Sequence, residues 1–174
     1  NLRTAVFFKY SFVVNEQILV QRDGFVLPGQ TKYLVALNQN IPPGASVYLK
    51  IEQANWQRLD PRQIPDWPAF LAEHDQFVIA DKQINLANNS SQLISQIKFR
   101  LENHSAYGYW SVPILIMAYQ GDDLIDVNEL VLSKVRAGEA RDIIFAWPGL
   151  KNVNYVEIVP MINFLDQNNY LPVD

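Results

Sequence analysis

The acidic side chains between residues 122 and 129 are those whose types and spacing best fit a chemical role. Asp122, Asp123 and Asp126 lie close together in the chain, and Glu129 follows them. Calcium takes about six to eight oxygen ligands from a converging loop, and these carboxylates could supply some of them. A strand beginning near Leu124 would instead send alternate side chains to opposite faces, leaving a solvated hairpin turn. The three aspartates are therefore candidate metal ligands, with the turn as the alternative.

Aromatic side chains form a second candidate site. Trp147 precedes Pro148 and Gly149 in a predicted loop, and Tyr107 and Tyr109 lie near another strand end. Exposed together, Trp147, Tyr107 and Tyr109 would form a platform for the stacking of sugar rings. Tryptophan is buried on average, however, and aromatic residues commonly fill the space between two sheets. These three residues are thus either binding residues or core residues.

Neither histidine of the chain predicts a catalytic centre. His74 lies between Glu73 and Asp75, but adjacent residues rarely orient one another, and catalytic triads assemble from distant positions. We expect His74 at the surface, at the end of a short helix, and His104 in a loop. The sequence also lacks the nucleophile-elbow, zinc-protease, phosphate-binding and dinucleotide-binding motifs. These observations predict a protein that is not an enzyme and needs no cofactor.

The composition excludes several classes of partner. The 174 residues carry a formal net charge of -4 without a dense cluster of lysine or arginine, so nucleic acid is not an expected partner. The chain contains no cysteine, which excludes disulfides, thiol nucleophiles and zinc–thiolate sites. The longest apolar run, 112–119, is less than half of the roughly 20 residues that a membrane-spanning helix needs. We therefore expect no membrane contact by this segment.

Alternating apolar side chains predict an all-β fold. Val47, Leu49 and Ile51 show the period of a half-buried strand, and the same period runs from Ile97 to Leu101. Such strands bury one face and expose the other. Turn residues separate the predicted strands, as they do in antiparallel β-sandwiches. The ten predicted strands cover 4–14, 17–26, 31–37, 46–55, 77–84, 93–102, 109–119, 124–135, 140–147 and 153–160.

The chain contains an internal repeat. Residues 26–37 resemble 135–146, and in both copies a loop and a further strand follow. Gly29 and Gly138 occupy matching turns, where glycine can take the positive φ of a tight turn. The repeat predicts two units of one architecture.

A short helix is predicted between the two copies. Asp66 is a suitable N-cap residue, and Pro68 fits the first helical turn. The helix should have about two turns. The predicted organisation is a first unit at 1–60, a linker with this helix at 61–76 and a second unit at 77–174.

The first copy is less complete than the second. The strands predicted at 77–84 and 93–102 precede the matching part of the second copy and have no counterpart in the first. A sheet left short in this way exposes backbone groups at an apolar edge. We therefore expect either that the natural chain continues upstream of Asn1, or that another chain adds a strand by β-augmentation.

The second copy resembles the small immunoglobulin-like domains of the FxLYD type. The resemblance is carried by residues 99–105, the apolar run 112–119, the turn at 121–125 and the Ala137-Gly138-Glu139 turn. Segments of the first copy are similar to those of membrane-anchored bacterial envelope proteins. Tyr119-Gln120 stands where FxLYD domains have a tyrosine–aspartate pair. The resemblance implies tandem immunoglobulin-like antiparallel β-sandwiches, an extracytoplasmic location at the cell surface or envelope, and an upstream anchor.

Together these patterns predict a non-catalytic extracytoplasmic module with a structural or protein-interaction role in a cell-envelope protein. Its partner would be a protein, or a second copy of the chain, bound through an exposed strand edge. A pilus-like or filament subunit that assembles by strand addition is one alternative. A carbohydrate-binding module that uses Trp147, Tyr107 and Tyr109 is another.

Overall fold

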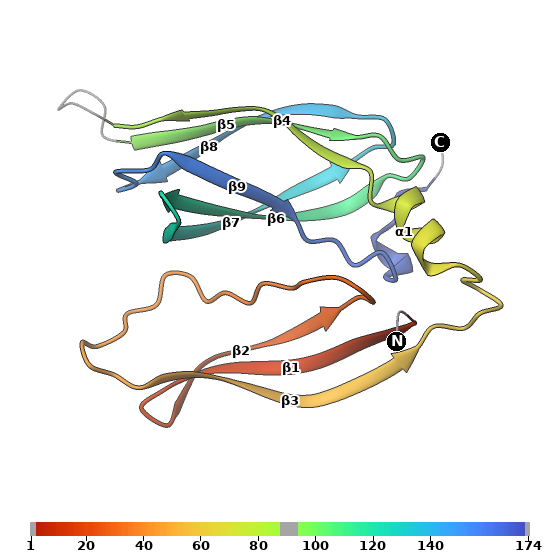
Figure 1. Ribbon diagram of the computed structural model, residues 1–174, viewed down its shortest axis with the longest axis horizontal. Helices are drawn as coiled ribbons and strands as arrows, with labels where there is room; N and C mark the ends of the chain where they lie inside the picture. The colour runs from red at the N-terminus through yellow and green to blue at the C-terminus, as the bar shows by residue number, and fades with distance from the viewer. Residues whose placement is uncertain (1–2, 88–93, 173–174) are drawn as a thin grey trace. The chain divides into compact units, whose positions relative to one another are not determined.

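The computed structural model describes residues 3–87 and 94–172, and antiparallel β-strands make up most of them (Figure 1). The predicted all-β class is confirmed. The chain divides into two compact units, Asn1–Phe70 and Leu71–Asp174, and the boundary between them falls inside the predicted linker 61–76.

Unit 1 contains one three-stranded sheet. Its strands are β1 (Thr4–Val14), β2 (Gln17–Val26) and β3 (Val47–Arg58), in the order β2-β1-β3. A two-residue turn joins β1 to β2, with φ of 47° at Asn15 and 64° at Glu16. Positive φ at both residues is typical of the hairpin turn that matches the twist of antiparallel strands, and asparagine tolerates it well.

Aromatic side chains of β1 build the core of unit 1. Phe8 and Tyr10 are buried, and their rings pack against Gly24 of the neighbouring strand β2. A Cβ atom at Gly24 would lie 2.7 Å from the Phe8 ring, so glycine is needed for this close packing.

The strand predicted at 31–37 is not present. This segment follows a turn in which the Gln30 N–H donates to the Leu27 carbonyl, and no strand of the described residues pairs with it. A strand requires a neighbouring backbone, and segment 31–37 pairs with none of the strands in this sheet. Residues 34–37 are half-buried all the same, and Arg22 of β2 donates to the Val35 carbonyl at 3.4 Å.

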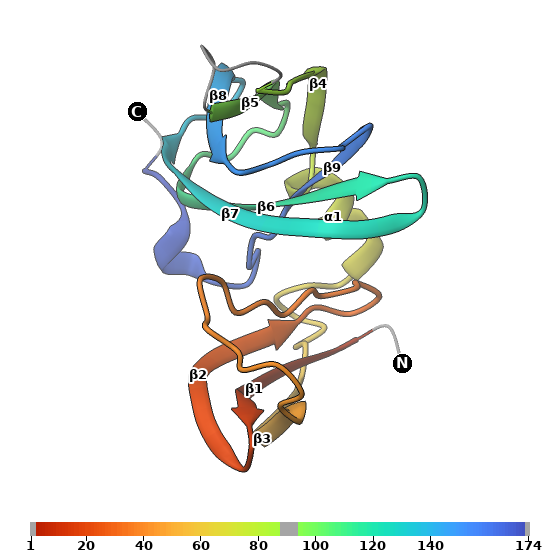
Figure 2. The same cartoon turned by 90° about the vertical axis from the view of Figure 1, so that its left-hand side faces the viewer.

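Unit 2 contains two three-stranded sheets that enclose a core (Figures 1 and 2). One sheet has the order β4-β5-β8 and the other β7-β6-β9. Buried side chains from β5 and β6, such as Ile97 and Ile116, fill the space between the sheets. The strands are β4 (Phe77–Asn85), β5 (Ile94–Asn103), β6 (Tyr109–Gln120), β7 (Asp123–Val135), β8 (Ala140–Pro148) and β9 (Tyr155–Pro160).

Two short helices complete the described structure. Helix α1 (Trp67–His74) begins where the sequence predicts it, and the Ala69 N–H donates to Oδ1 of the N-cap Asp66 at 3.1 Å. A 3-10 helix, η1 (Gln167–Asn169), follows β9, and Asp166 caps it in the same way.

Candidate functional site

The three candidate aspartates do not form a metal site in the structure. No group of three or more acidic, histidine or cysteine side chains among the described residues could hold a metal ion. Asp126 has a different partner, because Nε1 of Trp147 donates to its Oδ2 at 3.0 Å. Asp122 and Asp123 lie at the β6–β7 turn. The exposed Asp126 therefore joins β7 to β8 through this side-chain hydrogen bond.

The structure does not present Trp147, Tyr107 and Tyr109 as one exposed surface. Trp147 is 2% exposed and Tyr109 is fully buried. The Tyr109 hydroxyl donates to the His74 carbonyl at 3.1 Å. Tyr107 is half-buried and its hydroxyl donates to Glu73. A platform for sugar rings needs several exposed aromatic faces side by side, and these residues do not provide it.

His74 lies in an aromatic cluster, so the expectation that it is a surface residue is wrong. It is buried, and its ring stacks on Tyr107 with 4.0 Å between centroids. Tyr170 meets both His74 and Tyr107 edge-on, and its hydroxyl donates to the Phe164 carbonyl at 2.7 Å. The cluster attaches the end of α1 to the C-terminal segment of unit 2. The stacked and edge-on contacts of these rings are typical of aromatic packing in a protein core.

The buried tyrosines Tyr109 and Tyr170 are expected to make unit 2 less stable at high pH. Burial raises the pKa of Tyr170 from its ordinary 10.0 to about 12, and burial also raises the pKa of Tyr109. The folded state keeps both phenols neutral, while the unfolded chain loses their protons from about pH 10. Stability should therefore be fully present below pH 10 and fall as the pH rises through about 12. Circular dichroism against pH should show this loss, and Tyr170→Phe should reduce its slope; an unchanged slope would contradict the assignment.

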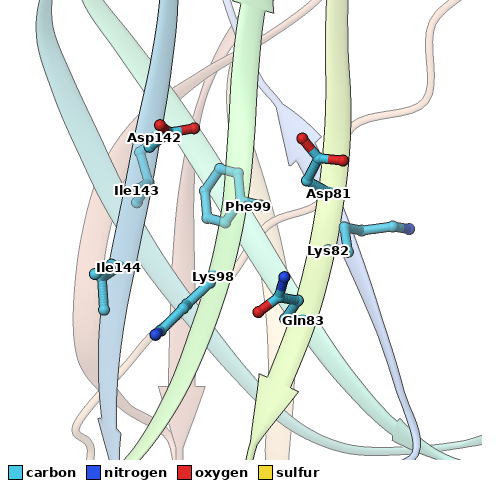
Figure 3. A pocket seen from close by; sticks show the side chains of 8 residues that line it. All are labelled: Asp81, Lys82, Gln83, Lys98, Phe99, Asp142, Ile143 and Ile144. Atoms are coloured by element: carbon cyan, nitrogen blue, oxygen red, sulfur yellow. The ribbon is translucent and has the colours of Figure 1, made fainter.

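A shallow depression of about 420 Å³ lies on the β4-β5-β8 sheet (Figure 3). A β-bulge in β4 creates it, because Asp81 and Lys82 both stand opposite Phe99. Two acidic and two basic side chains line it: Asp81, Asp142, Lys82 and Lys98. Asp142 is already paired with Arg100, whose Nε donates at 2.8 Å. This hydrogen bond lowers the pKa of the Asp142 carboxyl. The depression follows from strand geometry and gathers no catalytic group.

A buried asparagine that the sequence did not single out organises one end of unit 2. The Asn103 amide nitrogen donates to the carbonyls of Tyr107 at 2.7 Å and Arg136 at 2.9 Å. Its side-chain oxygen accepts from the Ser105 hydroxyl at 2.7 Å and from the Ser105 N–H. Asn103 thus joins the β5–β6 loop to the β7–β8 turn. The spacing Asn103-His-Ser105 is the only sign of this in the sequence.

The most exposed apolar strand is β3. It forms an edge of the unit 1 sheet. All of its residues are exposed except Glu52, which is half-buried. A β-bulge interrupts the strand where Gln53 and Ala54 face Phe8, and φ at Gln53 is 50°. Edge strands commonly carry such bulges, which limit uncontrolled pairing. The segment before the bulge is a regular, exposed strand.

The two faces of this part of β3 differ in polarity. On one face Lys50 pairs with Glu52 at 2.5 Å, and the Tyr48 hydroxyl donates to Glu16 at 3.0 Å. This hydrogen bond raises the pKa of the Tyr48 phenol. On the other face Leu49 is 42% exposed and Ile51 is 56% exposed. The polar side chains on the first face are thus paired with other side chains of unit 1, while the apolar side chains on the second face are exposed.

The apolar face continues on β1. Phe12 pairs with Leu49, and Tyr10 pairs with Ile51, so these four side chains lie on the same side of the sheet. Arg22 pairs with Tyr10 from the other strand and reaches the Val35 carbonyl on that same side. We call Phe12, Leu49 and Ile51 the apolar β3 side. An exposed apolar patch on an edge strand is the usual mark of a protein-binding surface.

No helix in the described part of the chain is long and apolar enough to cross a bilayer. Comparison of the chain with family models, with curated proteins and with solved structures finds no match.

Proposed function

We propose that the chain is a non-catalytic, extracytoplasmic protein-interaction module of a cell-envelope protein, built from two immunoglobulin-like units of which the first is an incomplete sandwich. The resemblance of residues 99–105 and 112–119 to FxLYD domains supports the immunoglobulin-like class and the location. The interaction role is supported by one observation above the others: Leu49 and Ile51 are exposed on a sheet edge. Function on a fold of this type must be assigned from a site, and the apolar β3 side is the best candidate.

The geometry of unit 2 supports the immunoglobulin-like assignment. Its sheets β4-β5-β8 and β7-β6-β9 have the strand orders expected of an A-B-E sheet and a C′-C-F sheet. The turns at Gly29 and Gly138 support a duplication, since both glycines have positive φ. In both turns an N–H donates three residues back, from Gln30 to Leu27 and from Glu139 to Arg136.

The test is site-specific cross-linking in the cells that produce the protein. A photoreactive amino acid at position 51 should give a discrete adduct with one envelope protein or with a second copy. The same amino acid at Val131, an exposed position of β7 in unit 2, should not give that adduct. Absence of an adduct from position 51, or identical adducts from both positions, would contradict the proposed role.

A filament subunit is the second candidate, and the observation that favours it is the regular, exposed edge of β3. A filament requires each chain to meet a second copy through this edge. The cross-linking experiment separates the two candidates, because the mass of the adduct shows whether the partner is another copy. Sedimentation at increasing concentration should then show open-ended association only for the filament.

A further inference from the structure

We infer that unit 1 accepts a two-stranded β-hairpin from a partner polypeptide, which pairs with segment 31–37 and covers the apolar β3 side. This inference deepens the proposed function, on which it rests, by naming the acceptor and the form of the partner. The register of unit 2 supports it, because the corresponding positions there are covered.

The two central hairpins have matching registers. In unit 1 the β1–β2 ladder shifts between Phe12 and Val13, and in unit 2 the β6–β7 ladder shifts between Ala118 and Tyr119. Each shift lies next to the hairpin turn. The sheet orders also match, as β2-β1-β3 and β7-β6-β9. Phe12 therefore corresponds to Ala118, and β3 corresponds to β9.

The third strands can then be compared position by position. Phe12 pairs with Leu49, and Ala118 pairs with Val156, so Leu49 corresponds to Val156. Two residues further along, Ile51 corresponds to Ile158. Val156 is 2% exposed and Ile158 is 7% exposed, against 42% for Leu49 and 56% for Ile51. The same sheet positions are buried in unit 2 and open in unit 1.

The difference has a specific cause in unit 2. Strand β4 lies against β9, and Lys82 of β4 donates to the Val156 carbonyl at 3.5 Å. Strand β8 faces β7 on the other side of the core through the Trp147–Asp126 hydrogen bond. The central strand β5 joins β4 to β8. We infer that strands β4 and β5 bury Val156 and Ile158 of β9.

Unit 1 has the counterpart of β8 but no counterpart of β4 or β5 among the described residues. Segment 31–37 follows the Gly29 turn as β8 follows the Gly138 turn, and it contacts β2 through Arg22 and Val35. Without a β5-like neighbour, its backbone joins no sheet. An added strand beside 31–37 would complete that backbone, and the next strand would cover Leu49 and Ile51.

This arrangement also fixes the chemistry of the occupant. In β5 the side chains that face the core are Ile97, Phe99 and Leu101, and the alternate positions are polar. The inner strand of the occupant must show the same alternation, because one face meets the core of unit 1 and the other meets solvent. The proposed partner must therefore supply a hairpin in which apolar and polar side chains alternate.

The experiment adds a labelled synthetic peptide of residues 77–103, the β4–β5 sequence, to the full chain. We expect saturable binding by fluorescence anisotropy, together with slower amide hydrogen exchange in segment 31–37. A control peptide with I97S, F99S and L101S should not bind. Ile51→Lys in the full chain should weaken binding at least about tenfold, which corresponds to about 1.4 kcal/mol, since it places a charge under the hairpin.

The control for Ile51→Lys is Val131→Lys, which makes the same change at an exposed position of unit 2 and should leave binding unchanged. Leu49→Lys serves as a second variant, and thermal unfolding of each variant alone checks that it remains folded. The inference is overturned if the peptide does not bind, or if Ile51→Lys and Val131→Lys behave alike.

The outcome also separates this inference from the proposed function. Binding that protects β3 but leaves segment 31–37 unprotected would show pairing at the β3 edge, which refutes the hairpin acceptor and retains an interaction module. Binding that protects 31–37, combined with no cross-link from position 51 in cells, would retain the acceptor geometry and refute the proposed role.

Discussion

Replacing Asn103 with leucine is expected to lower the free energy of unfolding of unit 2 by about 3 kcal/mol. The Asn103 side chain is fully buried, and it makes four hydrogen bonds to Ser105, Tyr107 and Arg136. Leucine has a similar volume but no polar atoms. The substitution therefore removes all four hydrogen bonds and takes away the acceptor of the buried Ser105 N–H. The carbonyls of Tyr107 and Arg136 each keep a second donor, the Ser105 hydroxyl and the Glu139 N–H. A buried polar group left without a partner costs about 1–3 kcal/mol, more than the net gain from a formed hydrogen bond.

Hydrogen exchange is the suitable measurement, because it reports unit 2 separately from unit 1. The amides of β6 should lose protection together in the variant. His104→Ala is the matched control, since the neighbouring His104 is exposed. Its Nε2 lies 2.8 Å from Oε2 of Glu102 at the protein surface. That change should cost less than about 1 kcal/mol. Similar costs for the two variants would show that the Asn103 network contributes little.

The sequence predicted most of the strands because their pattern is local. Alternation at Val47, Leu49 and Ile51 indicated a strand, and β3 is there. The same kind of pattern at 31–37 was wrong, since a strand also needs a partner backbone, which comes from distant parts of the chain. Periodicity gives the faces of a segment but does not give its neighbours.

The same limit explains the candidate site. The alternation in β3 predicted one buried face, whereas Leu49 and Ile51 are exposed because no second sheet covers them in the described residues. Trp147 shows the converse, since the sequence left it either a binding or a core residue and the structure buries it, with its Nε1 donating to Asp126. Burial depends on which sheet faces a residue, and the sequence pattern contains no direct record of that.

Replacing Trp67 with alanine is expected to lower the free energy of unfolding of unit 1 by about 3–5 kcal/mol. Trp67 begins α1 and is 2% exposed. Its Nε1 donates to the Pro28 carbonyl at 2.8 Å, and its ring stacks on Phe70 with 5.5 Å between centroids. Alanine would leave a cavity of the size of an indole and a carbonyl without its donor. The effect should be large because unit 1 has a single small sheet, so each buried aromatic ring is a large share of its core.

Trp67→Phe separates the two contributions. It keeps an aromatic ring against Phe70 but loses the hydrogen bond to Pro28, so it should cost about 1–2 kcal/mol. Trp56→Ala is the control for removal of an indole, since Trp56 is 71% exposed on β3 and its loss should cost less than about 1 kcal/mol. Hydrogen exchange of the β1 amides gives all three values for unit 1. If Trp67→Ala and Trp56→Ala lower the free energy of unfolding equally, Trp67 does not hold segment 27–30 on the core of unit 1. The turn before the proposed acceptor segment 31–37 must then be positioned by the buried Leu27, which is 1% exposed.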